Sequence, residues 1–170
     1  MAASFASVLL KPLGALPFFV HLWGDTETGK SVALLAAVSV WAEPVIGKYA
    51  YTFNSTDVGN ELYAACLNSL PLCMDELQIL NKRSDFDDII YRLCEGTGRL
   101  RGKKDGGIQN IKTWRNCIIT TGERPITSMS SGGGAVNRVI EIECNGGKFF
   151  KNPREFCRTC LLYTSPSPRD

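Results

Sequence analysis

The stretch from Gly24 to Ser31 has the residue types and the spacing of a loop that binds phosphate. Its two glycines, Gly24 and Gly29, allow the backbone to curl so that successive N–H groups point at phosphate oxygens. Lys30 supplies a mobile positive charge for the outer phosphates, and the Ser31 hydroxyl can ligate a magnesium ion. We therefore predict a nucleotide and Mg²⁺ as ligands. The eight residues are Gly24, Asp25, Thr26, Glu27, Thr28, Gly29, Lys30 and Ser31.

A second group with suitable chemistry is the pair Asp75 and Glu76, which follows the apolar run Leu70-Pro-Leu-Cys-Met. An aspartate at a strand tip can hold magnesium, directly or through water, beside the Ser31 hydroxyl. The adjacent glutamate points in another direction and can polarise the water that attacks a phosphate. The alternative is a strand that runs into an acidic helix cap. We predict metal binding by Asp75 and water activation by Glu76, because the distance from Lys30 leaves room for one strand and helix between them.

Two further positions have side chains that could act on a phosphate. The predicted strand that begins at Thr113 ends in polar residues, among them Thr120 and Thr121. A hydroxyl at a strand tip can sense the terminal phosphate, and the residues alone do not choose between the two. Arg138 stands just before a later strand, where an arginine could stabilise transition-state charge across a subunit boundary or make a structural ion pair. From the residues alone we assign catalytic roles to Glu76 and Lys30, and Thr120, Thr121 and Arg138 are candidates.

A glycine-rich basic segment lies between residues 96 and 107 and carries Arg99, Arg101, Lys103 and Lys104. Basic side chains among glycines suit contacts with nucleic-acid phosphates, or with the nucleotide of a neighbouring subunit. The alternative is a flexible loop whose charges face solvent. We predict that these four residues contact nucleic acid.

The flanking patterns predict the elements that would position these residues. A nearly continuous apolar run precedes the loop, as in a strand buried on both faces, and an Ala/Leu-rich helical stretch follows it. Open α/β sheets place ligands at the carboxyl ends of their strands. We therefore predict an α/β fold with a mostly parallel central sheet and helices on both faces, a three-layer αβα sandwich. Strands are expected in 17–23, 48–53, 70–75, 113–123 and 137–143, helices in 30–41, 58–68 and 84–94, and a Ser/Gly loop in 128–135.

Length and composition limit the class of protein. The 170 residues suffice for one domain with a core, and a net charge of +2 means that a nucleic-acid surface would be local. No segment approaches the ~20 apolar residues of a membrane span, and the N-terminus lacks a secretion signal, so we expect a cytoplasmic protein. Most of the seven cysteines lie in apolar runs and are expected to be buried and reduced; Cys157 and Cys160 form a weak zinc signal. The single histidine, His21, is expected to be a core residue rather than a catalyst.

The last residues differ in character from everything before them. Residues 160–170 look like the in-frame translation of a transposon-based sequencing adapter and are expected to be non-native. We therefore divide the chain into a helical lead-in (1–16), an ATPase core (17–148), the start of a truncated C-terminal extension (149–159) and this tail (160–170).

The order of these motifs resembles that of P-loop NTPases of the type with an additional strand and a catalytic glutamate. More narrowly, five segments over roughly residues 1–145 resemble a helicase-like domain family of phages, plasmids and integrated elements, often joined to primase modules. The segments are 21–31, 52–56, 70–77, 98–104 and 120–123.

This resemblance implies magnesium-dependent ATP hydrolysis coupled to DNA unwinding or remodelling in replication of a mobile element, by a homo-oligomeric ring with a possible primase partner. It also implies catalytic roles for Thr121 and Arg138. A different class, an ATP-dependent assembly or regulatory switch that moves no DNA, shares the nucleotide motifs. A small-molecule kinase is a weaker third reading, since Glu76 beside the metal aspartate favours attack by water.

Overall fold

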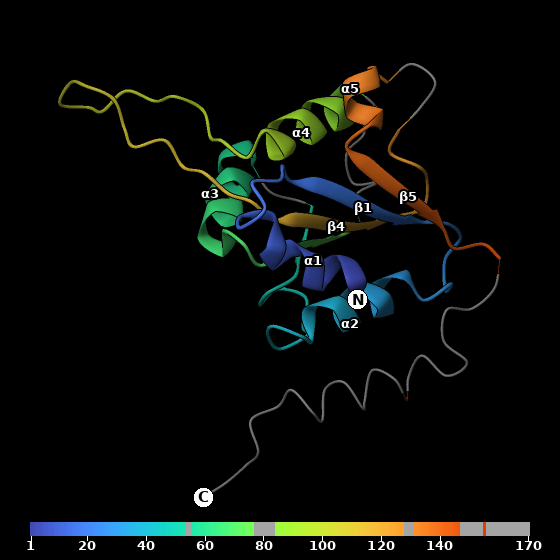
Figure 1. The fold of residues 1–170 in the computed structure, drawn as a ribbon. Coiled ribbons are helices and arrows are strands. Elements are labelled where there is room, and N and C mark those ends of the chain that lie inside the picture. The colour runs from blue at the N-terminus through green and yellow to red at the C-terminus, as the bar shows by residue number, and fades with distance from the viewer. Residues whose placement is uncertain (54–55, 77–83, 128–130, 147–154, 156–170) are drawn as a thin grey trace, which may run out of the picture.

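A five-stranded parallel sheet forms the centre of the protein in the computed structural model, which describes residues 1–53, 56–76, 84–127, 131–146 and 155 (Figure 1). The spatial order is β2-β3-β4-β1-β5, and every neighbouring pair of strands is parallel. The strands are β1 (Phe18–Trp23), β2 (Tyr51–Thr52), β3 (Leu72–Asp75), β4 (Cys117–Gly122) and β5 (Val139–Glu143). The predicted α/β class is confirmed.

Helices cover both faces of this sheet, because successive strand residues point to opposite sides. Phe19, Leu72 and Ile118 pack in one core, whereas their neighbours Val20, Cys73 and Ile119 pack in another. Figure 1 shows α1 and α2 on one face and α4 and α5 on the other, with α3 beside α4. The predicted three-layer sandwich is therefore correct. The helices are α1 (Ala2–Leu10), α2 (Lys30–Val38), α3 (Asp57–Leu67), α4 (Ser84–Glu95) and α5 (Gly133–Val136).

Helix α1 is tied to the sheet by two buried serines. Ser7 Oγ accepts a hydrogen bond from the backbone N–H of Cys117 and donates one to the Ser69 carbonyl. Ser4 Oγ donates to the Ala37 carbonyl of α2. The expected N-terminal helix is thus part of the packed structure. No helix in the described ranges has the length and apolarity needed to cross a membrane.

Strand β4 lies between β1, which leads into the predicted phosphate loop, and β3, which ends at Asp75. The register pairs Leu22 with Thr121 and Met74 with Thr120. All three strands therefore end at the same edge of the sheet, which brings their polar C-terminal residues together.

Three elements differ from the sequence-based expectations. The strand expected over 48–53 is regular only at Tyr51–Thr52, since this edge strand has a single neighbour. The loop expected over 128–135 contains the one-turn helix α5, while residues 128–130 lie outside the described ranges. The glycine-rich basic segment is an irregular hairpin, with antiparallel bridges Thr97–Thr113 and Gly102–Ile108.

The expectations for the C-terminal part concern residues that the structure does not describe, apart from Glu155. This applies to the truncated extension over 149–159, the adapter-like tail and the Cys157/Cys160 pair. Of the described cysteines, Cys73, Cys94, Cys117 and Cys144 are buried free thiols, as expected, whereas Cys66 is exposed. Burial raises the pKa of Cys73 and of Cys94 to about 12, so both thiols are protonated and unreactive at neutral pH.

Candidate functional site

The predicted phosphate loop connects β1 to α2 and has the backbone that its glycines require. Gly24 has φ 145° and Gly29, the N-cap of α2, has φ 95°. Both values lie in the region that side chains disfavour. Glu27 has φ 63°, so the loop bends sharply in its middle as well. The loop therefore curls at the N-terminal end of α2, where the helix dipole favours an anion.

The Lys30 ammonium lies over this curl and is held by the loop itself. Its Nζ donates to the carbonyls of Gly24 (2.9 Å) and Asp25 (2.5 Å) and to Thr28 Oγ1 (3.3 Å). All three acceptors are neutral, and none of these contacts is with a carboxylate that would neutralise the positive charge. Such a charge can pair with a phosphate oxygen.

Asp75 is in contact with polar side chains of helix α2 and strand β4. Its Oδ1 accepts a hydrogen bond from Ser31 Oγ at 3.2 Å and another from Thr121 Oγ1. Asp75 is 4% exposed and Thr121 is 2% exposed, although Ser31 itself is open to solvent. The sequence-predicted residues Ser31, Asp75 and Thr121 are thus in direct contact.

The Ser31 and Asp75 oxygens fit a magnesium ion. Mg²⁺ takes oxygen ligands at 2.0–2.1 Å in an octahedron, so adjacent ligand oxygens lie about 2.9 Å apart. The 3.2 Å between Ser31 Oγ and Asp75 Oδ1 is close to that separation. No cluster of three or more His, Cys, Asp or Glu side chains exists in the described ranges. A metal held here would therefore depend on one carboxylate, the serine hydroxyl and the oxygens of a bound phosphate, as Mg²⁺ commonly does.

The two threonines at the tip of β4 face opposite sides, which separates their roles. Thr120 Oγ1 lies 2.9 Å from His21 Nδ1, and His21 Nε2 lies 2.9 Å from the Arg124 carbonyl. His21 is fully buried, and burial lowers its pKa; the Arg124 carbonyl and Glu141 oppose this effect, and Lys30 adds to it. His21 is therefore a satisfied core residue. Thr121, not Thr120, faces Asp75.

Glu76 follows Asp75 in a left-handed backbone conformation with φ 58°. Its N–H donates to Thr121 Oγ1 at 3.2 Å, so the same hydroxyl contacts both acidic residues. A non-glycine residue in this conformation stores backbone strain of roughly 1–2 kcal/mol. Glu76 is exposed and follows directly on Asp75 at the carboxyl end of β3.

One residue in contact with the phosphate loop has no motif in the sequence. Asn145, just after β5, accepts a hydrogen bond from the Asp25 N–H through its Oδ1 at 2.7 Å. A single asparagine after a predicted strand is common, so the sequence alone gives no signal for this contact.

Arg138 lies at the other edge of the sheet. It precedes Val139, which pairs with Phe19 at the start of β1, five residues before Gly24. At ~3.3 Å per strand residue, Val139 is roughly 16 Å from the level of Gly24, and Arg138 lies one residue farther, at roughly 20 Å. The Arg138 guanidinium stacks over the Tyr91 ring of α4, with 5.1 Å between Cζ and the ring centroid. Within one chain, Arg138 is therefore not beside the phosphate loop.

The basic hairpin also leaves the sheet at this far edge, immediately before β4, and Figure 1 shows it extending away from the body of the molecule above α3. Two of its arginines pair with α3: Arg101 Nη2 lies 2.9 Å from Glu61 Oε2, and Arg99 Nε lies 3.8 Å from Glu61 Oε1. Lys103 and Lys104 are exposed and have no ion pair with any described residue.

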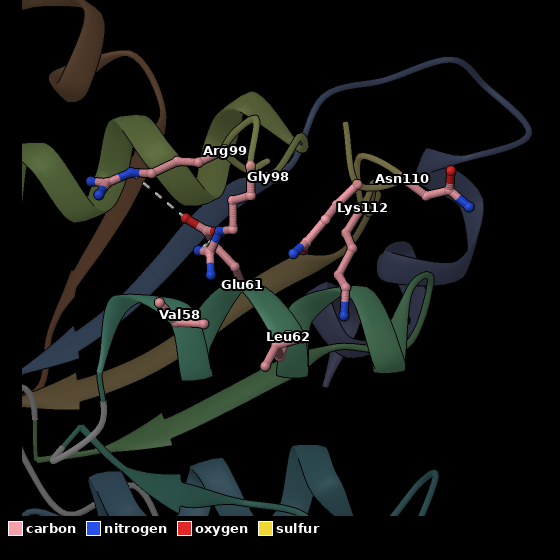
Figure 2. Close-up of a pocket in the computed structure, with 9 residues that line it drawn as sticks. Val58, Glu61, Leu62, Gly98, Arg99, Asn110 and Lys112 are labelled. Atoms are coloured by element: carbon pink, nitrogen blue, oxygen red, sulfur yellow. Dashed lines mark hydrogen bonds and ion pairs between the residues drawn. The ribbon is translucent and has the colours of Figure 1, made fainter. Parts of the chain in front are cut away.

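A pocket of about 200 Å³ lies between the hairpin and α3 (Figure 2). Arg99 and Glu61 face each other there, and the Glu61 side chain is buried. None of the residues that line the pocket belongs to the phosphate loop. The residues around it are Val58, Glu61, Leu62, Gly98, Arg99, Arg101, Gln109, Asn110 and Lys112.

Comparisons with known proteins identify one family and several similar structures. Residues 1–113 match the family described as "Domain of unknown function (DUF927)". A solved structure titled "SCCmec type IV Cch - active helicase" has a TM-score of 0.70 and 24% identity, with coverage of 94% of this chain and 30% of that chain. "The X-ray structure of JCV Helicase" has a TM-score of 0.46 and 11% identity, with coverage of 96% and 50%. No curated protein sequence matches the chain.

The first structural match shows that this chain shares the fold of a segment of that helicase. The chain spans 30% of the helicase chain's length. The match therefore supports the architecture of the sheet and its helices, and it leaves the activity to be argued from the residues at the sheet edge.

Proposed function

The chain belongs to the DUF927 family, and from that premise and the geometry of the sheet edge we propose that it binds and hydrolyses Mg²⁺–ATP. The observation that carries the proposal is the contact of Ser31 and Thr121 with Asp75 beside the Lys30 loop. Strands β3 and β4 and helix α2 supply these residues, and the loop follows β1. The chain is then a P-loop NTPase whose nucleotide site lies at the carboxyl ends of β1, β3 and β4.

Each residue has a role that follows from its position. The loop N–H groups and the Lys30 ammonium bind the outer phosphates; Lys30 keeps its contact with the Gly24 carbonyl and exchanges those with the Asp25 carbonyl and the Thr28 hydroxyl for phosphate oxygens. Ser31 and Asp75 hold Mg²⁺, which neutralises charge on the phosphates. Thr121 fixes the Asp75 carboxylate and the Glu76 backbone at once. Glu76 accepts a proton from water as the water oxygen bonds to the terminal phosphorus and the bond to the ADP oxygen breaks.

We further propose that the full-length protein couples hydrolysis to work on DNA, as the helicase whose fold it shares suggests. Lys103 and Lys104 are the preferred DNA contacts, because they are exposed and unpaired at the far end of the hairpin. Arg99 and Arg101 would have to exchange Glu61 for a phosphate first. DNA would therefore bind at the hairpin, at the opposite edge of the sheet from ATP.

A ring of subunits fits the position of Arg138. Because Arg138 lies roughly 20 Å from the phosphate loop of its own chain, its predicted role requires the nucleotide of a neighbouring subunit. It would then leave Tyr91 to reach that phosphate. A joined or separate primase module remains part of this proposal for the whole protein.

An ATP-dependent switch without DNA movement is the second candidate. The observation that favours it is the pairing of Arg99 and Arg101 with Glu61, which turns part of the basic surface inward. ATP-dependent oligomerisation, together with hydrolysis that single-stranded DNA does not change, would select this candidate. Stimulation of hydrolysis by DNA would select the first.

The experiment that tests the shared nucleotide proposal is calorimetric titration of the chain with Mg²⁺–ATP, beside Lys30→Ala and a Lys48→Ala control. Lys48 is an exposed lysine that pairs with Glu43. We expect binding by the wild type and the control, and none by Lys30→Ala. Equal affinity in all three would overturn the proposal.

A further inference from the structure

The phosphate loop is held from outside by the edge strand β5, through Asn145. The ladder between β1 and β5 continues to the loop, because the Cys144 N–H donates to the Trp23 carbonyl at 2.8 Å. The next residue, Asn145, then lies directly against Gly24 and Asp25. Its Oδ1 accepts the Asp25 N–H at 2.7 Å.

The peptide unit between Gly24 and Asp25 is fixed on both of its sides. Its N–H points to Asn145, while its carbonyl accepts a hydrogen bond from Lys30 Nζ at 2.9 Å. The N–H and C=O of a trans peptide point in opposite directions, so fixing one sets the direction of the other. Asn145 therefore sets the orientation of the carbonyl that holds the Lys30 ammonium.

The shapes of the neighbouring residues support this arrangement. A Cβ at Gly24 would lie 2.4 Å from Asn145 Oδ1 and 3.4 Å from the Asn145 nitrogen, so only glycine permits this approach. The Asn145 amide is itself oriented, because its Nδ2 donates to Glu143 Oε1 at 3.2 Å. The carboxylate thus keeps the amide oxygen turned toward Asp25.

We propose that Asn145 is a positioning residue of the nucleotide site, which acts through the Gly24–Asp25 peptide on Lys30. This inference rests on the proposed function and adds β5 to the strands that build the site. Displacing Asn145 would release the peptide and with it the preferred position of the ammonium group.

The test uses the whole chain and two readouts, Mg²⁺–ATP affinity by calorimetry and hydrogen exchange of the Asp25 amide. For Asn145→Ala we expect affinity to fall about tenfold, the cost of one hydrogen bond to a backbone group, and the Asp25 amide to exchange at least about tenfold faster. Asn110→Ala is the matched control, since this exposed asparagine lines the pocket at the hairpin base. It should change neither readout.

A double variant tests the contact rather than the mere presence of asparagine. Glu143→Gln with Asn145→Asp keeps the total charge, exchanges donor and acceptor within the pair, and retains an oxygen for the Asp25 N–H. In this double variant the Asp25 amide should exchange as slowly as in the wild type. In Asn145→Asp alone, two carboxylates lie together, and the amide should exchange faster.

Each remaining outcome decides a specific point. Wild-type affinity in Asn145→Ala, or weaker binding with unchanged Asp25 exchange, would overturn the inference while the nucleotide site stands. Absence of Mg²⁺–ATP binding by the wild-type chain would overturn the nucleotide site, and with it any role for Asn145 there. If the wild type does not bind Mg²⁺–ATP but the Asp25 amide exchanges faster in Asn145→Ala than in the wild type, the contact between Asn145 and Asp25 is established as structural.

Discussion

At the scale of single residues, Asp75 and Glu76 are neighbours in the chain with different surroundings. Asp75 is buried and accepts two hydroxyl hydrogen bonds, whereas Glu76 is exposed and turned by its left-handed backbone. A buried, oriented carboxylate suits a metal, and an exposed one beside it suits a water molecule. The division of roles therefore follows from backbone geometry as well as from the order of the two residues.

Replacing the exposed carboxylate of Glu76 should lower the rate of ATP hydrolysis and leave ATP binding in place. For Glu76→Gln we expect Mg²⁺–ATP affinity within about twofold of the wild type and a hydrolysis rate at least ~100-fold lower, because the amide cannot accept the proton of the attacking water. Phosphate release, measured beside binding by calorimetry, checks this. Glu43→Gln, which alters an exposed glutamate outside the site, is the control. Unchanged hydrolysis in Glu76→Gln would remove Glu76 from the mechanism.

The buried His21 should make stability depend on pH. Its pKa is held below the ordinary 6.5, mainly by burial, so the unfolded chain binds more protons than the folded chain just below that value. The free energy of unfolding should therefore be at its full value above pH 6.5 and decrease as the pH falls below it. Urea unfolding at pH 7.5 and 5.5 measures this difference. In His21→Asn the part of the decrease due to His21 should vanish, and an identical decrease in both proteins would contradict its assignment.

At the scale of elements, the hairpin of residues 97–113 depends on a tight approach at its base. Gly96 has φ 67°, and a Cβ there would lie 2.1 Å from Arg115 Nη1 and 2.7 Å from the Trp114 carbonyl. Gly106, in the hairpin turn, has φ 87° but open space around it. The two glycines thus share a conformation and differ in their surroundings.

Alanine at these two glycines should have unequal effects on stability. Gly106→Ala should cost only the conformational strain, about 1 kcal/mol, while Gly96→Ala should cost about 3 kcal/mol because a backbone carbonyl must also move. Chemical denaturation of the two variants measures the difference. Equal losses would mean that the base of the hairpin is not packed as described.

The exposed lysines of the hairpin should control the salt dependence of DNA binding. If Lys103 and Lys104 each contact one phosphate of a single strand, Lys103→Ala with Lys104→Ala should reduce the slope of log affinity against log salt by about 1.4. Fluorescence titrations of a labelled oligonucleotide at several salt concentrations provide the slope. Lys11→Ala, an exposed lysine after α1, should leave it unchanged. A slope unaffected by the double substitution would exclude the hairpin as the DNA contact.

The sequence predicted the sheet because its strands are short apolar runs with clear boundaries. Periodicity and spacing were enough to place Lys30, Ser31 and Asp75 at one sheet edge, since parallel strands share that edge. They could not choose between Thr120 and Thr121, because the choice depends on which face of β4 each side chain takes. Asn145 was not predictable, because its contact with Asp25 depends on the register of β5 against β1, which no local pattern encodes.

At the scale of the whole molecule, the sheet has two functional edges in this account. ATP binds at the carboxyl ends of the strands, and the basic hairpin and Arg138 lie at the other edge. Neighbouring subunits or DNA would have to connect the two edges, because no described side chain reaches across. A ring in which Arg138 meets the next subunit's nucleotide provides that connection without a change of fold.

The measurement that tests the central claim most directly is the effect of Mg²⁺ on ATP affinity in a double-mutant cycle of Ser31→Ala and Asp75→Asn. We expect Mg²⁺ to strengthen ATP binding to the wild type, and each single substitution to remove most of this gain. The double variant should lose little more of the gain than either single variant, because both oxygens serve one ion. A Mg²⁺ effect that persists in the double variant would contradict a metal site between α2 and β3.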